Sequence, residues 1–328
     1  MTMQARRKKL AILHDEGAPR GSHQHMVGKI AEFLRAMDVE IVNLYGTGYF
    51  EPADAVFVHV DRSVVPAKMV RFARRFPEQI NLNACDIRKR AFADGLLEPG
   101  DVYPAPVIVK SDLNYGGAPE LASRSLLTRL THRIARLATR TPRRLIAQKS
   151  DYRIFPALSD VPADYFTPDN IVQKLMLEKD GAKNVLREYI FLKSLHYENV
   201  EHSLSEIITE DEHISCLPFT PHPRLISLRR RLKLDYGKID YVMVDGEPFI
   251  FDANKTLGLG DYGDSEQFAE DYQTMLKAFA EEIYRLLNES ERRAGPATGS
   301  QSGDSEPKAR SSRYPHAART LATARSAR

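Results

Sequence analysis

The first 84 residues alternate short apolar runs with apolar positions at helical spacing. Apolar and β-branched runs predict strands at 9–14, 39–44, 53–60 and 79–83. Between these runs, apolar residues that recur every three or four positions predict helices near 26–37 and 69–76. Strands that alternate with helices are typical of a parallel sheet covered by its crossover helices. Residues 1–84 therefore predict a small parallel α/β domain.

The middle of the chain has a different pattern. Residues 87–97 predict a helix, and PAPVIVK at 104–110 predicts a strand that ends at Lys110. The loop after this strand contains Gly116 and Gly117, whose lack of side chains lets backbone amides approach an anion closely. Leucines at helical spacing among arginines predict an amphipathic basic helix over 118–140. We assign residues 85–172 to a second domain.

Residues 237–258 read GKIDYVMVDGEPFIFDANKTLG and predict a β-hairpin, with its turn at Asp245-Gly246. Antiparallel pairing across this turn brings Asp240 close to Asp252 and Asn254. A strand alternates its side chains, so Asp252 and Asn254 share one face, whereas Phe251 is expected to pack on the other.

The hairpin thus gathers carboxylate and amide oxygens, which are the ligands that Mg²⁺ prefers. Either acid alone could simply cap a strand end, but three such side chains in register favour a metal site. Because a strand-end acid adds little to core packing, replacing Asp252 by Ala is expected to leave the fold intact.

After the hairpin, apolar residues at helical spacing predict a helix that closes the third domain, 173–291. Residues 292–328 are rich in Ala, Ser, Gly and Arg and poor in large aliphatic side chains, so we expect a disordered basic tail.

Composition narrows the class of protein. The 328 residues are 42% hydrophobic, and 47 basic residues nearly balance 44 acidic ones, which argues against a dedicated nucleic-acid binder. The apolar run near residue 10 is too short for a signal peptide, and no run reaches membrane-spanning length. The two cysteines form no disulfide or metal pattern. A cytoplasmic protein without a membrane partner is expected.

The hairpin resembles the metal-binding hairpin of the ATP-grasp superfamily, and in particular that of the D-alanine:D-alanine ligases. Those enzymes begin the hairpin with Gly-Arg-Ile-Asp and end it with Leu-Glu-Ala-Asn. Here the start is GKID, with Lys238 in place of Arg, and the end is FDAN, with the shorter Asp252 in place of Glu, which leaves the number of metal ions open. The strand that ends at Lys110 resembles the superfamily's Val-Ile-Val-Lys strand, and NIVQKL at 170–175 resembles its hinge.

The resemblance implies an ATP-grasp fold of mixed α/β and α+β class, in which a parallel α/β pre-grasp domain precedes two grasp subdomains with ATP between them. It implies that the phosphates contact Lys110, Gly116 and Gly117. The hinge residues Gln173, Lys174 and Leu175 would contact the adenine, and Glu178 the ribose. Mg²⁺, which Mn²⁺ could replace, would be held by Asp240, Asp252 and Asn254.

The resemblance also implies two catalytic residues, Lys238 and Arg187, which would stabilise an acyl phosphate and the tetrahedral oxyanion. Arg187 could equally pair with a local acid. The implied function is an ATP-dependent carboxylate-amine or carboxylate-thiol ligase that acts through an acyl phosphate. A small-molecule kinase of the same fold and a nucleotide-binding protein without turnover remain as alternatives. No motif in the loops of the first domain specifies the carboxylate or the amine.

Overall fold

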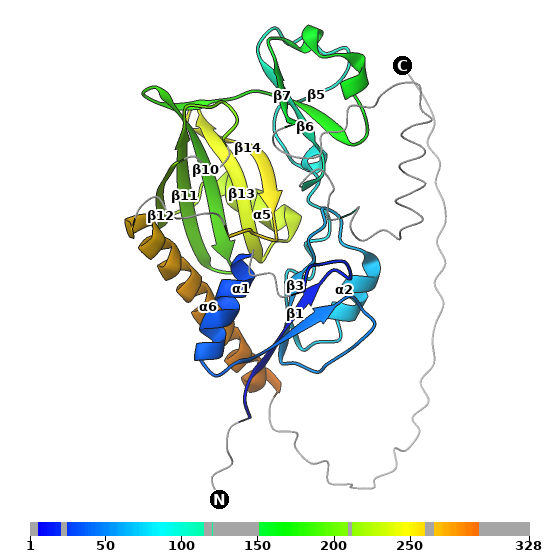
Figure 1. The fold of residues 1–328 in the computed structure, drawn as a ribbon, viewed down its shortest axis with the longest axis vertical. Helices are drawn as coiled ribbons and strands as arrows, with labels where there is room; N and C mark the ends of the chain where they lie inside the picture. The colour runs from blue at the N-terminus through cyan, green and yellow to red at the C-terminus, as the bar shows by residue number, and fades with distance from the viewer. Residues whose placement is uncertain are drawn as a thin grey trace, which may run out of the picture. The chain divides into compact units, whose positions relative to one another are not determined.

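The computed structural model describes residues 6–20, 25–114, 120, 151–208, 212–259 and 266–294, without the side chains of 212 and 290–294. These residues form one parallel and two antiparallel sheets (Figure 1). The predicted fold class, mixed α/β and α+β, is confirmed.

The first sheet has four parallel strands in the order β2-β1-β3-β4. Its strands are β1 (Lys9–His14), β2 (Glu40–Tyr45), β3 (Ala55–His59) and β4 (Glu78–Ile80). Helices α1 (Met26–Ala36) and α2 (Ala67–Ala73) follow β1 and β3. Every residue of β3 is buried, and its apolar run AVFV is typical of a central strand in a covered parallel sheet.

The second sheet is antiparallel, with the order β5-β8-β6-β7. Its strands are β5 (Leu96–Leu97), β6 (Val107–Ser111), β7 (Arg153–Phe155) and β8 (Asn170–Lys174). Short 3-10 turns are η1 (Lys89–Ala91), η4 (Leu158–Asp160) and η5 (Ala163–Tyr165). Strand β8 crosses the boundary expected after residue 172, so its last two residues also belong to this sheet.

The helix predicted over residues 87–97 is wrong. This segment contains only η1 and β5, because tertiary contacts hold its backbone in a non-helical path. Ile250 N donates to Asp94 Oδ2 (2.8 Å), and Lys174 N donates to Gly95 O (2.9 Å). Gly95 has a φ of +63°, which interrupts a helix. The segment therefore lies beside the hairpin as a connector.

The third sheet has six strands, in the order β12-β11-β10-β13-β14 with β9 also paired to β10. Its strands are β9 (Glu178–Asp180), β10 (Lys183–Leu192), β11 (Leu195–Ser203), β12 (Glu212–Pro218), β13 (Tyr236–Val244) and β14 (Glu247–Asn254). Helix α5 (Pro223–Leu232) precedes the hairpin, and α6 (Glu266–Ala294) follows it.

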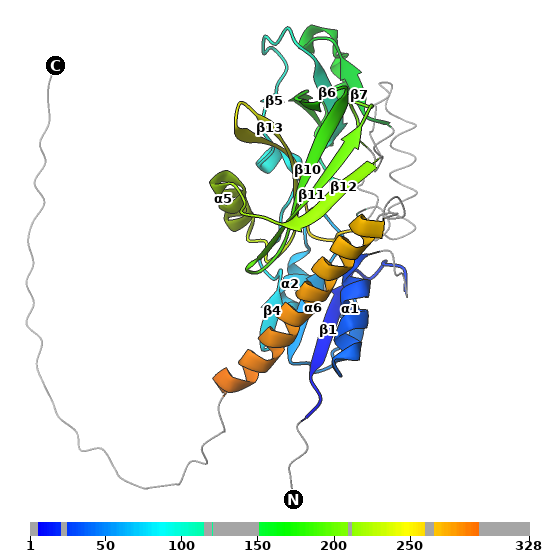
Figure 2. The same cartoon turned by 90° about the vertical axis from the view of Figure 1, so that its left-hand side faces the viewer.

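The two faces of the third sheet pack against different helices (Figure 2). On β10, Tyr189 and Phe191 share an apolar cluster with α5, whereas Ile190 and Leu192 share a cluster with α6. This is the alternation that the sequence REYIFL predicts for a strand buried on both sides. Glu188 lies on the same face of β10 as Ile190 and Leu192. The face of β10 toward α6 is therefore apolar at Ile190 and Leu192 and polar at Glu188.

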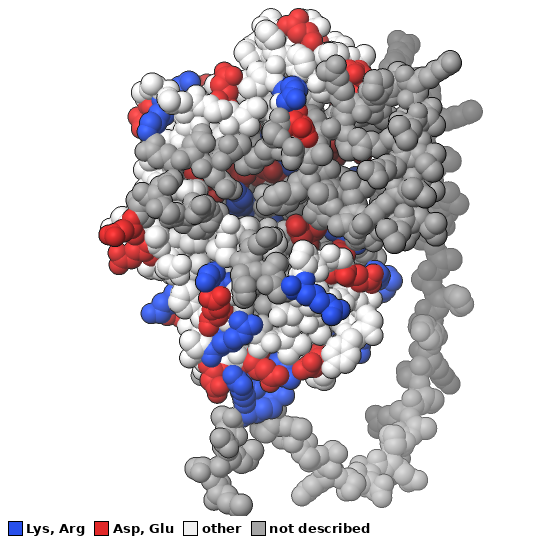
Figure 3. Space-filling model, in the orientation of Figure 1, with Lys and Arg blue, Asp and Glu red and all other residues white. Residues whose placement is uncertain are grey.

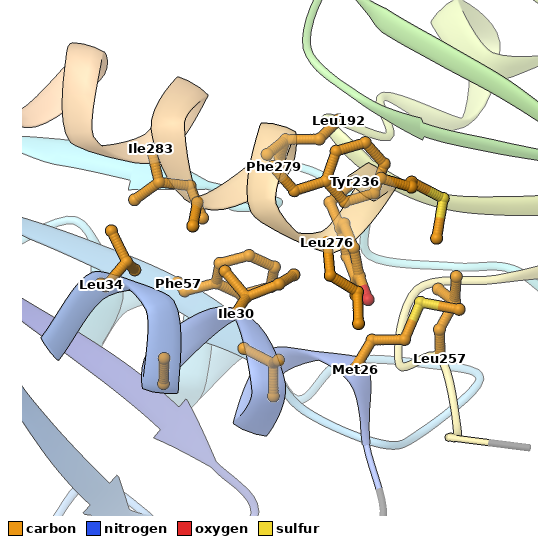
Figure 4. Packing of buried hydrophobic residues seen from close by; sticks show 14 of the residues in the cluster. Met26, Ile30, Leu34, Phe57, Leu192, Tyr236, Leu257, Leu276, Phe279 and Ile283 are labelled. Atoms are coloured by element: carbon orange, nitrogen blue, oxygen red, sulfur yellow. The ribbon is translucent and has the colours of Figure 1, made fainter. Parts of the chain in front are cut away.

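Helix α6 joins the third sheet to the parallel domain. Its Leu276, Phe279 and Ile283 belong to one core cluster with residues of α1, β3 and β13 (Figure 4). At the end of β4, the Asn81 side chain donates to Tyr236 O (2.8 Å) and accepts from Tyr236 N (2.9 Å). These contacts fix the start of β13, and hence the hairpin, against the first domain.

Some predictions fall outside the described residues. They are the loop with Gly116 and Gly117, nearly all of the helix 118–140, and the tail beyond Ala294. Within the described part of the chain, no helix combines the length and apolarity needed to span a bilayer. On the face seen in Figure 3, basic and acidic side chains are interspersed over the described surface, in keeping with the near-balance of charge.

Candidate functional site

The hairpin of β13 and β14 places its polar residues as the sequence predicts. Asp245 and Gly246 both have positive φ, 51° and 83°, as a two-residue type I′ turn requires. In the strand register Asp240 lies opposite Asp252, and Lys238 lies opposite Asn254. One face of the hairpin therefore carries two carboxylates, an ammonium and an amide.

A β-bulge modifies this face. The register shifts between Asp240 and Tyr241, because Tyr241 pairs with Ile250 and leaves Phe251 as the extra residue. The Phe251 ring consequently lies in the cleft, with its centroid 5.2 Å from Lys110 Nζ. The expectation that Phe251 packs on the opposite face is wrong, since one inserted residue reverses the alternation locally.

The cleft is formed by both antiparallel sheets. Its charged lining includes Lys110, Asp240 and Asp252, and Lys110 is only 6% exposed. The empty volume, including the open mouth, is about 740 Å³.

Apolar side chains line the remainder of the cleft. They are Ile108, Leu175, Met176, Leu177, Val185, Leu186, Ile207, Ile208 and Val242. A pocket with apolar walls and a few charged groups can hold a ligand with a flat apolar part and an anionic part.

Each carboxylate of the hairpin has a lysine nearby. Asp252 Oδ2 lies 3.1 Å from Lys89 Nζ, and Asp240 Oδ1 lies 3.4 Å from Lys238 Nζ. Lys238 also forms an ion pair with Glu188. Burial by itself lowers the pKa of Lys238, but the carboxylates of Asp240, Glu188 and Glu201 outweigh it and raise that pKa well above its usual value. Lys238 is therefore a cation at neutral pH.

Tyr152 lines the same cleft. Burial raises the pKa of its phenol, and the nearby carboxylates of Asp252 and Asp240 raise it further. Tyr152 is therefore a neutral hydrogen-bonding group at the edge of the charged part of the cleft.

The donor set fits a divalent cation that uses two carboxylates. Asp240 and Asp252 are directly opposed, and both line the cleft. The Asn254 oxygen instead accepts from Asn114 Nδ2 (2.6 Å), so Asn254 can act as a third ligand only by releasing Asn114. Among the described residues no group of three or more His, Cys, Asp or Glu side chains could hold a metal. Mg²⁺ commonly takes one or two carboxylates and completes its shell with phosphate oxygens and water.

Arg187 and Glu178 lie elsewhere. They form an ion pair, with Nη2 to Oε1 at 2.7 Å, and Arg187 also pairs with Glu198 (3.2 Å). In the register Arg187 lies opposite Tyr241, which puts it on the face of the sheet away from Asp240. The side-chain hydrogen bond to Glu178 is the largest influence on the pKa of Arg187, and it raises that pKa. Burial lowers the pKa, but the hydrogen bond and the nearby carboxylates outweigh burial. Neither residue is among the described residues that line the cleft. Arg187 therefore pairs with local acids, and neither it nor Glu178 lies where the expected phosphate or ribose contact would need it.

The hinge segment is only partly as expected. Lys174 and Leu175 line the cleft, but Gln173 is fully buried and donates from Nε2 to Asp94 O (2.6 Å). Leu175 N donates to Pro106 O (3.0 Å), so that amide is already engaged. The backbone that can face an adenine is thus the link of residues 175–177 between β8 and β9.

Sequence reasoning missed several residues of the site. Lys89 gave no signal, because it stands in a basic run, Arg88-Lys89-Arg90, far from the hairpin in sequence. Asn114 joins Lys89 to the hairpin, since its Oδ1 accepts from Lys89 Nζ (3.1 Å). Glu188 could have been found, because it is an acid on the otherwise apolar half of β10.

A parallel α/β domain therefore precedes two antiparallel sheets that enclose a cleft with a lysine and two acids.

No protein-family model and no curated protein sequence matches the chain. Among solved structures, a D-alanine–D-alanine ligase from Bacillus anthracis is similar over 88% of this chain and 100% of its own, with 10% identity and a TM-score of 0.45. An ATP-grasp ligase solved with a minimal precursor is similar over 84% and 99%, with 12% identity and a TM-score of 0.45. A macrocyclase from Microcystis aeruginosa, solved with its precursor peptide, is similar over 84% and 99%, with 10% identity and a TM-score of 0.42.

Proposed function

We propose that this protein is an ATP-dependent ligase that joins a carboxylate to an amine, or to a thiol, through an acyl phosphate, with release of ADP and phosphate. The observation that carries the proposal is the shared cleft of Lys110, Asp240 and Asp252 between two antiparallel sheets. A buried lysine suits the phosphates of a nucleotide, and two opposed carboxylates suit the divalent cation that accompanies them.

In this proposal the adenine lies against the apolar walls, including Ile108 and Val242, and faces the backbone of residues 175–177. Lys110 binds the phosphates as a point charge, and Phe251 packs beside it. Asp240 and Asp252 hold Mg²⁺, which when bound neutralises the phosphate charge during transfer. Mn²⁺ would serve in the same way.

Lys238 is the proposed catalytic cation. It stands next to Asp240 on the hairpin and carries its charge at neutral pH. A fixed positive charge beside the phosphate-binding end of the cleft can stabilise the acyl phosphate and the tetrahedral oxyanion that forms when the amine attacks. We do not assign this role to Arg187, which lies on the other face of the sheet.

A nucleotide-binding protein without turnover is the second candidate. One observation favours it: Lys89 and Lys238 each lie within ion-pair distance of one hairpin carboxylate, and so partly take the place of a divalent cation.

Incubation of the protein with Mg²⁺-ATP and pooled carboxylates and amines tests the proposal. ADP, phosphate and a condensed product are expected together in the wild type and lost in Lys110→Met. Lys179→Met is the matched control, because Lys179 is exposed on β9. ADP that forms without any need for an amine would indicate a kinase. ATP binding without ADP would indicate the non-catalytic protein.

A further inference from the structure

Each carboxylate of the hairpin is paired with a lysine of the chain itself. Lys238 divides its charge between two acids, because it pairs with Glu188 as well as with Asp240. Lys89 and Asp252 instead form ion pairs only with each other among the described residues, with Nζ 3.1 Å from Oδ2. The charges of this pair therefore cancel, and the pair presents no net negative charge to the cleft that Asp252 lines.

The ammonium of Lys89 is fixed in place. Its side chain is 2% exposed, and Nζ also donates to Asn114 Oδ1 (3.1 Å). Asn114 is itself held by the hairpin, because its Nδ2 donates to Asn254 Oδ1 (2.6 Å). The backbone amide of Lys89 donates to Asp112 O (3.1 Å). Lys89 is not among the described residues that line the cleft, so its charge stays beside Asp252 and is poorly screened by the solvent.

A fixed ammonium opposes a divalent cation on the same carboxylate. Like charges repel, and the repulsion is stronger in a buried site than in water because the effective dielectric constant is lower. A nucleotide changes this balance, since its phosphates bring negative charge into the cleft beside Lys110, the lysine proposed to bind them. The phosphates also supply oxygen ligands that complete the shell of Mg²⁺. The hairpin should therefore bind a divalent cation weakly by itself and tightly together with a triphosphate.

We propose that Lys89 makes metal binding at the hairpin conditional on the nucleotide, so that the divalent cation is retained only together with a triphosphate. This inference rests on the proposed function, because it requires a nucleotide in the cleft. Lys89 is a positioning residue, which acts on the metal through the charge of Asp252. The coupling is reciprocal by thermodynamic linkage, so the cation must raise the affinity for the nucleotide by the same factor. Removal of the Lys89 charge should weaken the coupling between the two ligands.

The test titrates Mn²⁺ into the full chain with and without a non-hydrolysable ATP analogue, and follows free Mn²⁺ by electron paramagnetic resonance. In Lys89→Met, the Mn²⁺ affinity without the analogue should rise roughly ten-fold, because Asp252 then keeps an uncancelled charge. The ratio of the affinities with and without the analogue should fall by a similar factor. A merely destabilising substitution would not raise the affinity for the metal. Lys179→Met, at an exposed position on β9, is the matched control and should keep the wild-type ratio.

The outcomes separate this proposal from the one on which it rests. Failure of the wild type to bind the analogue in the presence of Mn²⁺ would refute the proposed function. Binding of the analogue, with Mn²⁺ bound equally tightly in its absence, would refute the coupling alone. An unchanged affinity ratio in folded Lys89→Met would overturn the role of Lys89. If Lys89→Met does not fold, Lys89→Gln takes its place under the same criteria, because a glutamine amide still donates a hydrogen bond but carries no charge.

Discussion

Lys89 and Asp252 form an ion pair that links the connector before the second sheet to the end of the hairpin. The two atoms, Nζ and Oδ2, are 3.1 Å apart, and the Lys89 side chain is only 2% exposed. Asp252 is thus the counter-charge of a buried ammonium as well as a candidate metal ligand. The sequence-based expectation that Asp252→Ala leaves the fold intact does not take this pair into account.

We therefore predict that Asp252→Ala lowers the free energy of unfolding by about 3 kcal/mol, because it leaves a buried charge without its partner. Lys89→Met combined with Asp252→Ala should recover part of this loss. Chemical denaturation of the wild type, both single variants and the double variant measures the coupling. Wild-type stability in Asp252→Ala would show that the pair contributes nothing.

Lys255 predicts a pH dependence of stability. Burial lowers the pKa of Lys255 from 10.5 to about 8, and the carboxylates of Asp61 and Glu120 only partly oppose this shift. Between pH 8 and 10.5 the unfolded chain therefore holds more protons on this residue than the folded one, so stability rises with pH in that window. The full rise from this group is about 3 kcal/mol, and below pH 8 its contribution is constant.

Unfolding free energies of the wild type and Lys255→Met at pH 8, 9 and 10 test this prediction. The rise should be smaller in Lys255→Met, and should persist in the exposed control Lys179→Met. Equal pH dependence in wild type and Lys255→Met would contradict it.

Gly237 is required by a close approach of two backbones. A Cβ at this position would overlap the carbonyl oxygen of Asn254 on the paired strand. Gly237→Ala should therefore displace the hairpin next to Lys238 and destabilise the protein by about 2 kcal/mol. Gly48→Ala is the control, since a Cβ at position 48 would lie more than 4 Å from every described residue other than its chain neighbours. Equal melting temperatures for the two variants would show that the strands can separate at no cost.

Arg187 is predicted to have a structural role. Because it pairs with Glu178 and Glu198, Arg187→Gln should lower stability by about 1 kcal/mol, a modest value for a partly exposed pair. Affinity for an ATP analogue should change less than two-fold. A loss of more than ten-fold in that affinity, with the fold intact, would show that Arg187 contributes to nucleotide binding and would contradict a purely structural role.

Local sequence was sufficient for the features whose contacts are local. The hairpin could be predicted because its turn, Asp245-Gly246, and the pattern of apolar and polar residues in its strands lie within one continuous segment of the sequence. The parallel order of the first domain followed from alternating strands and helices. The bulge at Phe251 could not be predicted, since a single extra residue changes no pattern over the length of a strand.

Features that depend on distant partners escaped prediction. The segment 87–97 has helical periodicity, but its backbone groups bond to Ile250 and Lys174 instead. Arg187 matched a family position, yet the face it occupies is set by the register with β13. Lys89 could be recognised as a site residue only from the structure, because the fold brings it next to Asp252.

The central claim is that Asp240 and Asp252 together hold one divalent cation beside a triphosphate bound by Lys110. Electron paramagnetic resonance of Mn²⁺ titrated into the protein with a non-hydrolysable ATP analogue tests it most directly. The wild type should bind Mn²⁺ tightly only when the analogue is present, and Asp240→Asn should lose that Mn²⁺ while an Asp235→Asn control retains it. Tight Mn²⁺ binding that survives in Asp240→Asn, or its absence from the wild type with the analogue bound, would contradict the account.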